Sequence, residues 1–194
     1  MDRAKVTDEP NIVQWPGWED LDKRFEPYAL QLGWLAYSWN SLHDRLGQLF
    51  WVLTGLQNGK VPLAIWNAVK NDRTQRDLVR ATAGEALAAN PSVLDEIKWV
   101  LDRADTFEEH RNNALHSPLT FMIDADGPQL SSKWLSGNQR AMKLKDKNLL
   151  SEFAWYGRSA NALAIYVQRI TIHLKDSTQF PMPKRPKLPA RGDA

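Results

Sequence analysis

Residues 149–174 read LLSEFAWYGRSANALAIYVQRITIHL. Apolar residues recur through this stretch at alternating steps of four and three: Leu149, Phe153, Tyr156, Ala160, Leu163, Val167, Ile170 and Leu174. A repeat of 3.5 residues places all of them on one face of a long helix. We therefore expect a helix over residues 148–175 that buries this stripe against other helices.

Three earlier segments also carry helical periodicity. One apolar stripe predicts a helix from Ala29 to about Gly55, formed by Leu35, Trp39, Leu42, Leu46, Leu49 and Leu53. A second helix is expected from Pro62 to about Ala89, but residues 71–77 are strongly polar, so it is either two pieces or half-solvated.

The third helix has clear signals at both ends. Asn90 is a suitable N-cap and Pro91 suits the first helical position, while Ser117 precedes Pro118 and is biased toward extended backbone. We expect this helix to end near His116.

Between the third and last helices, two short β-prone runs flank an Asp-Gly-Pro turn and predict a hairpin at about 119–135. The fold class expected is all-α: an up-down bundle of four or five helices with this hairpin inserted before the last helix.

Residues 1–28 are predicted to form an irregular arm whose tryptophans dock on the body. Residues 29–177 are the helical domain, and 178–194 form a basic, proline-rich tail expected to be disordered.

Composition excludes several classes of site. The 194 residues contain no cysteine, which removes disulfides, thiolate metal sites and a cysteine nucleophile. The net charge of +2 is too balanced to indicate a nucleic-acid-binding protein by electrostatics alone. No apolar run approaches the ~20 residues of a membrane span, and no secretory signal is evident, so we expect a cytoplasmic protein.

One charged residue breaks the stripe of the third helix, which consists of Val93, Ile97, Val100, Ala104 and Phe107. The next position of the stripe is Arg111, where packing alone would favour an apolar side chain. A buried charge is costly unless it is paired. Either Arg111 pairs with Glu108 one turn back as a structural ion pair, or it belongs to a functional site.

Residues 111–116 read RNNALH. They resemble the motif of the HEPN superfamily (higher eukaryotes and prokaryotes nucleotide-binding), in which an arginine, often followed by a polar residue, precedes a histidine late in a helical bundle. The resemblance extends to the order of elements over residues 29–175.

The resemblance implies a metal-independent endoribonuclease without a cofactor, acting as a toxin or phage-defence effector. Arg111, Asn112 and His116 would be its catalytic residues. Glu108, Glu109 and His110 would support them, although pairing on the helix surface is the commoner role of such glutamates.

The implied partners are RNA, a second copy of the chain that brings both motifs into one cleft, and a cognate antitoxin or regulatory protein. The alternative function is a catalytically inactive HEPN-like module that binds a nucleotide, a nucleic acid or a protein. A third alternative is an unrelated bundle that acts as an interaction scaffold.

The chemistry of such a site needs only a proton-transfer group and a cation, because RNA carries its own nucleophile, the 2′-hydroxyl. Histidine can transfer the proton and arginine can hold two phosphate oxygens. On an ideal helix, however, Arg111 and His116 are about 7.5 Å apart along the axis and rotated by about 140°. Either the helix frays before Pro118, or the site is completed across subunits.

Overall fold

The computed structural model describes residues 17–124 and 127–191, with the side chains of Asp124 and Ser136 excepted. The elements are α1 (Trp18–Leu53), α2 (Lys60–Ala68), α3 (Asp72–Ala86), α4 (Pro91–His116), β1 (Leu119–Asp124), β2 (Gly127–Ser132), the 3₁₀ turn η1 (Trp134–Ser136), α5 (Gln139–Lys143) and α6 (Leu149–Lys175). The predicted helical architecture with one antiparallel hairpin is confirmed at this level.

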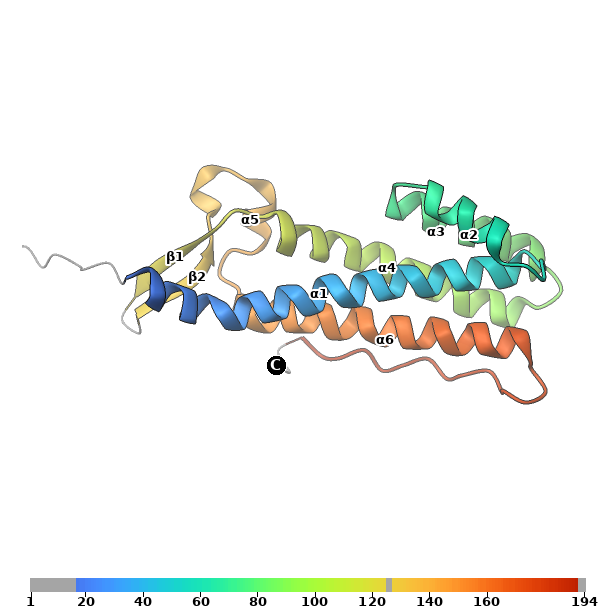
Figure 1. Cartoon of the computed structure of the whole chain (residues 1–194). Helices are drawn as coiled ribbons and strands as arrows, with labels where there is room; N and C mark the ends of the chain where they lie inside the picture. The colour runs from blue at the N-terminus through green and yellow to red at the C-terminus, as the bar shows by residue number, and fades with distance from the viewer. Residues whose placement is uncertain (1–16, 125–126, 192–194) are drawn as a thin grey trace, which may run out of the picture.

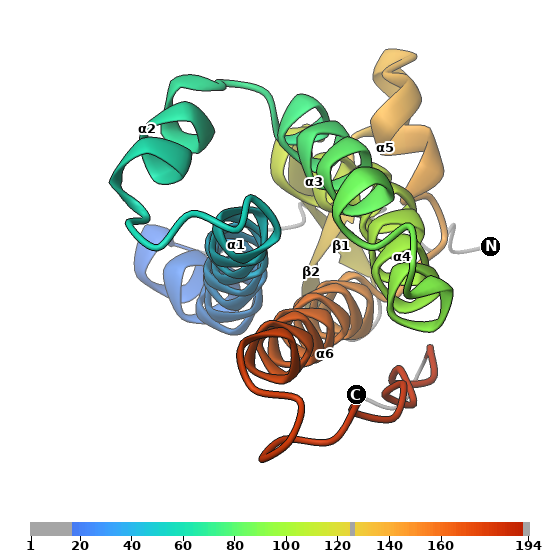
Figure 2. The ribbon, with the colours of Figure 1, turned by 90° about the vertical axis from the view of Figure 1, so that its right-hand side faces the viewer.

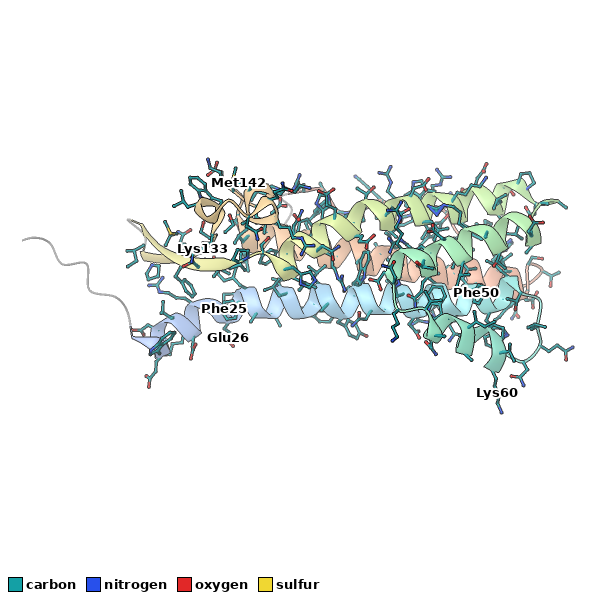
Figure 3. The ribbon with its side chains drawn as sticks, turned by 90° about the horizontal axis from the view of Figure 1, so that it is seen from above. Phe25, Glu26, Phe50, Lys60, Lys133 and Met142 are labelled. Carbon is teal, nitrogen blue, oxygen red and sulfur yellow. The ribbon has the colours of Figure 1, made fainter. Side chains whose placement is uncertain are left out.

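Three long helices form the body of the molecule (Figure 1). α1 and α6 run in the same direction and pack along most of their length, and α4 runs in the opposite direction beside them. At one end α3 covers the seam between α1 and α4, and α2 packs against α1 (Figure 2). The hairpin and α5 lie at the other end, near Phe25, whereas Phe50 and Lys60 mark the end that carries α2 (Figure 3).

The stripe of α6 is buried as its periodicity predicts, from Leu149 to Ile170. α1 and α6 approach closely at Gly157, where an added Cβ would lie 3.3 Å from the backbone nitrogen of Leu35. A glycine inside a helix costs conformational entropy, and here the close approach of the two backbones explains it.

Local capping signals place several helix ends correctly. Asn90 caps α4 by accepting from the backbone N–H of Val93, with Pro91 in the first turn, and α4 ends at His116. Asn148 caps α6 in the same way. Of the two alternatives for the second helix, the structure has two pieces, α2 and α3, because residues 69–71 leave the helical conformation and Asn71 starts a new helix as its N-cap.

The N-terminal arm differs from its prediction. Residues 1–16, including Trp15, lie outside the described part of the chain, but residues 18–28 form the first turns of α1 rather than irregular backbone. Glu19 and Asp20 lie in the first turn and stabilise the helix, because their negative charges are attracted to the positive N-terminal end of the helix dipole. Trp18 is 83% exposed and does not dock on the body.

The C-terminal tail also differs from its prediction. Residues 181–191, the C-terminal strap, extend along α6 and run back toward its N-terminus (Figure 1). The Trp155 indole donates to the carbonyl oxygen of Pro189 (2.8 Å), and the Tyr166 hydroxyl, which donates to Glu96 of α4 (2.8 Å), lies 3.3 Å from the carbonyl oxygen of Pro183. Of the predicted tail, residues 192–194 lie outside the described part of the chain. For residues 178–191 the expectation of disorder was wrong, because side chains of the bundle such as Trp155 bind backbone carbonyls that the strap cannot pair internally.

Two arginines of the strap fix it to the body. Arg185 pairs with Glu96 of α4 (2.6 Å), and Arg191 forms two hydrogen bonds to Glu152 of α6 (2.6 and 2.7 Å). The Arg191 guanidinium also lies 5.3 Å from the ring centroid of Trp155, at cation–π distance. The strap therefore contributes to the stability of the α4–α6 side of the bundle.

Arg191→Ala should lower the melting temperature by about 2–4 °C, equivalent to about 1 kcal/mol, because Glu152 loses its bidentate partner. Lys187→Ala is the matched control, since Lys187 is an exposed basic residue of the same strap. Differential scanning calorimetry measures both changes. Equal melting temperatures for the two variants would contradict an anchoring role for Arg191.

Candidate functional site

Arg111 lies where α4 faces α1 and the start of α3, with its side chain 24% exposed. Its guanidinium carbon is 5.6 Å from the centroid of the Trp39 ring. Nη1 donates to Oδ1 of Asn112 (2.8 Å), and Nη2 is 3.9 Å from Oδ2 of Asp72. Nε is buried and has no hydrogen-bond partner among the described residues. The guanidinium is thus held in place without all its donors being used.

Glu108 does not pair with Arg111, so the structural ion pair considered from the sequence is not formed. It accepts instead from Nη2 of Arg76, at 2.5 Å. Arg111 is left with Asn112 as its close partner and a long ion pair to Asp72. The charge on the stripe of α4 is therefore compensated mainly by α3 and by the Trp39 ring.

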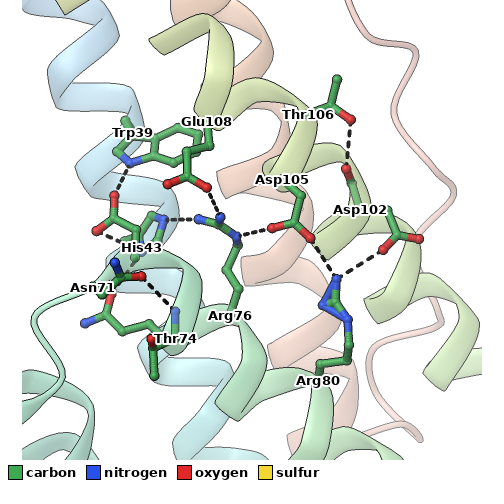
Figure 4. A network of polar contacts seen from close by, with 12 residues as sticks. Trp39, His43, Asn71, Thr74, Arg76, Arg80, Asp102, Asp105, Thr106 and Glu108 are labelled. Atoms are coloured by element: carbon green, nitrogen blue, oxygen red, sulfur yellow. Dashed lines mark hydrogen bonds and ion pairs between the residues drawn. The ribbon is translucent and has the colours of Figure 1, made fainter. Parts of the chain in front are cut away.

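Arg76 of α3 is the centre of a buried polar network (Figure 4). Its side chain is 0% exposed, and its Nε donates to Asp105 of α4 (2.7 Å). With the bond to Glu108, two carboxylates on successive turns of α4 hold one guanidinium. Its guanidinium carbon lies 5.8 Å from the centroid of Trp39, so this indole contacts both Arg76 and Arg111.

The network continues to α1 through His43, whose tautomer follows from its partners. Both amide hydrogens of Gln75 are directed at backbone carbonyls of residues 66 and 69. The Gln75 Oε1 atom, 3.0 Å from His43 Nδ1, must then accept, so Nδ1 carries the proton. Nε2 is left to accept from Arg76 Nη1 (3.4 Å). This arrangement requires a neutral His43.

Burial lowers the pKa of His43 from its ordinary value of 6.5, and the charges of Arg76 and Arg111 lower it further. Asp72, whose Oδ1 atom is 4.0 Å from Nδ1, opposes the shift, as does the bond to Gln75. A protonated ring would present a second N–H to the Arg76 guanidinium, which has no acceptor to offer it.

His110 belongs to an aromatic cluster facing α6. Its ring stacks on Tyr156 (centroids 5.0 Å apart, planes at 10°) and contacts Trp155 and Phe107. Burial lowers the pKa of His110, and the nearby charge of Arg191 adds to this effect. His110 was predicted to support Arg111, but its ring contacts are with Phe107, Trp155 and Tyr156.

Glu109 projects from another face of α4, toward α5, where it pairs with Lys143. The hydrogen bond from Lys143 lowers the pKa of Glu109, so its carboxylate stays ionised. Glu109 therefore links α4 to α5 rather than to Arg111.

His116 is exposed at the last position of α4 and forms no hydrogen bond or ion pair within residues 17–124 and 127–191. α4 does not fray before Pro118, because it remains helical through His116. Asn112 and Asn113 precede His116 by four and three residues, so all three share one face of the helix. Within one chain, Arg111 and His116 therefore point in directions about 140° apart.

That face of α4 borders a polar pocket of about 420 Å³, closed on its other side by Gln139, Arg140 and Lys143 of α5. Asn112 lines this pocket while its Oδ1 atom holds Arg111. Of the three predicted catalytic residues, Asn112 lines this pocket; His116 lies one helical turn further along α4 and is not part of the lining.

Sequence reasoning missed the α3 residues that support Arg111. A signal was present, since Arg76 falls on a stripe with Val79 and Ala83, at steps of three and four. The polar segment 71–77 hid it, because a charged residue on a polar stretch gives no sign of burial.

Within the described ranges, no group of three or more histidines and carboxylates is arranged to hold a metal ion. In the same ranges, no helix combines the length and the apolar character required to cross a membrane.

Comparison with protein-family models, with curated proteins and with solved structures finds no match for this chain. The likeness to the HEPN superfamily therefore rests on the RNNALH motif and the order of elements alone.

Arg76→Ala should lower the free energy of unfolding by about 3 kcal/mol, because it leaves Asp105 and Glu108 without their shared cation. Arg73→Ala, an exposed arginine one turn earlier on α3, should change it by less than about 0.5 kcal/mol. Urea denaturation followed by tryptophan fluorescence measures both values. Similar losses in the two variants would show that Arg76 is not the centre of the network.

The free energy of unfolding should also decrease as the pH falls below about 6.5. The pKa of His43 is lower in the folded protein than in the unfolded chain, so the unfolded chain takes up the proton first. The stability that the neutral His43 contributes is complete above pH 6.5, and it is lost as the pH falls toward the pKa of His43 in the folded protein. His43→Asn, which keeps a donor for Gln75 but cannot titrate, should reduce the slope of stability against pH below about 6.5. An unchanged slope in urea titrations of the variant would assign the pH dependence to other groups, such as His110.

Proposed function

We propose that this chain is a metal-independent endoribonuclease of HEPN type, with Arg111, Asn112 and His116 as its catalytic residues. The observation that carries the proposal is the state of Arg111. Its guanidinium is fixed against Trp39 yet remains 24% exposed, with a buried Nε that has no protein partner among the described residues. Arg76, by contrast, has a partner for each of its three guanidinium nitrogens.

The proposed reaction uses the 2′-hydroxyl of RNA as the nucleophile. An imidazole removes its proton, the oxygen attacks the adjacent phosphorus, and the bond to the 5′-oxygen breaks as that oxygen takes up a proton. Arg111 stabilises the added negative charge on the phosphorus because its planar fork of N–H groups matches two phosphate oxygens. Asn112 keeps Arg111 oriented through the Oδ1 hydrogen bond.

The site is proposed to form between two copies of the chain. Because α4 is helical through His116, one chain directs Arg111 and His116 to different sides. In a dimer formed across the seam of α1 and α4, each chain would supply its His116 imidazole to the Arg111 of the other chain. The role of toxin or phage-defence effector, the cytoplasmic location and a cognate antitoxin or regulatory partner belong to the same proposal and rest on the resemblance.

The purified protein should cleave total RNA in the presence of EDTA, and Arg111→Ala and His116→Ala should each reduce the rate by at least about a hundredfold. Arg169→Ala is the control, since Arg169 is an exposed arginine in the C-terminal half of α6. Gel electrophoresis of the RNA measures the rate, and circular dichroism verifies that each variant is folded. Equal cleavage by all preparations would identify a contaminating nuclease.

A mixing experiment tests the shared site. Arg111→Ala and His116→Ala proteins, each inactive alone, should regain activity when they are unfolded together and refolded, because the mixed dimer contains one intact pair. Mixing that restores nothing, although a dimer forms, would contradict a site assembled from two chains.

If the wild-type protein does not cleave RNA but binds it, and Arg111→Ala weakens the binding, the enzyme proposal is wrong. The alternative, an inactive HEPN-like binding module, would then be the better description.

A further inference from the structure

The pocket between α4 and α5 contains a buried polar side chain without a partner. Asn113 is only 5% exposed and forms no side-chain hydrogen bond with the part of the chain that the structure describes. Its amide lies on the wall of the pocket. Its amide atoms are not sealed from solvent, so their donor and acceptor groups are available to a ligand that enters the pocket.

Arg140, on the α5 side of the same pocket, is also available to a ligand. It is exposed, and no carboxylate of the described ranges pairs with it. The neighbouring Lys143 differs, because it is engaged by Glu109. The pocket thus presents one uncommitted guanidinium near one uncommitted amide.

The acidic residues that line the pocket do not prevent an anion from entering. Asp105 and Glu108 are bound by the buried Arg76, Asp105 also accepts from Arg80, and Glu109 is paired with Lys143. Each carboxylate therefore already has a cation beside it. Four carboxylates (Asp102, Asp105, Glu108 and Glu109) are balanced by four cations (Arg76, Arg80, Lys143 and Arg140), and of these cations Arg140 is the one that pairs with none of the carboxylates.

We propose that this pocket binds one nucleotide of the RNA substrate next to the cleaved linkage, with Arg140 on a phosphate and the Asn113 amide on the edge of the base. The inference rests on the proposed function. An asparagine amide offers a donor and an acceptor, which matches the edge of a nucleobase, and arginine matches phosphate. Single-stranded RNA is read in this way, through unstacked bases placed in pockets.

The position of the pocket fits a subsite adjacent to the reaction. Asn113 and His116 are three residues apart on one helix face, about 4.5 Å along the axis. The volume of about 420 Å³ lies within the range of small-ligand sites, about 300–1,000 Å³. The pocket would thereby select which nucleotide stands beside the cleaved bond.

Binding is measured with the full-length His116→Ala protein, so that no cleavage occurs, and a short fluorescein-labelled single-stranded RNA. Adding Arg140→Ala should weaken the affinity by about tenfold and reduce the slope of log K against log salt by about one. Adding Arg169→Ala should change neither value. Because Arg140 is exposed, its loss should leave the fold intact, which circular dichroism verifies.

Asn113→Ala tests the base contact. In the otherwise wild-type protein, it should change the nucleotide found beside the cleaved bonds when the ends of the RNA products are sequenced. Arg140→Ala should raise KM more than it lowers kcat. If cleavage depends on Arg111 and His116 but neither Arg140→Ala nor Asn113→Ala alters affinity, KM or site choice, the pocket proposal is overturned and the proposed function stands.

Free AMP, GMP, CMP and UMP distinguish the remaining outcomes by isothermal titration calorimetry. Binding of mononucleotides as tight as that of RNA, and dependent on Arg140, would overturn the assignment to RNA and identify a free-nucleotide site. RNA binding that depends on Arg140 in a protein that never cleaves RNA would support the pocket and overturn the ribonuclease.

Discussion

The arrangement of α1, α3 and α4 depends on one buried cation. Arg76 is fully withdrawn from solvent, and it is tolerated because two carboxylates of α4, the Trp39 ring and the neutral His43 surround it. An unpaired charge at that depth would be strongly destabilising, so the packing of α3 across the seam depends on the ion pairs that Arg76 forms with Asp105 and Glu108. Polar contacts of this kind are directional, and they fix the register of α3 more narrowly than apolar contact alone.

Trp39 connects this structural network to the motif arginine. Its indole lies between two guanidinium groups and donates to Asp72, which in turn faces Arg111. The orientation of Arg111 thus depends on residues of α1 and α3 that are far away in the sequence. A motif of six residues is sufficient to suggest a chemistry, but the groups that hold its arginine come from the rest of the bundle.

The same helix, α4, serves three surfaces at once. One face meets α1 and α3 through Arg111 and Glu108, a second meets α6 through His110, and a third lines the α5 pocket through Asn112 and Asn113. This division follows from the rotation of about 100° per residue, which sends consecutive residues of the motif to different neighbours. It also explains why the predicted supporting residues separate: Glu108, Glu109 and His110 face α3, α5 and α6 respectively.

The sequence alone determined the elements whose signals are local. The stripes of α1 and α6, the Asn90–Pro91 start of α4, its end before Pro118 and the hairpin all follow from periodicity, capping and turn chemistry, and the structure has them in place. The early turns of α1 were predicted as part of an irregular arm, although Pro27 is exposed and tolerated within the helix.

Only the tertiary structure decided the partners. That Glu108 holds Arg76 rather than Arg111, that Asn113 is buried without a hydrogen bond, and that a basic proline-rich tail lies ordered along α6 all depend on residues distant in the chain. Charge, unlike hydrophobic periodicity, carries no local sign of where its partner lies, because an ion pair forms between whichever groups the packing of the apolar stripes brings together.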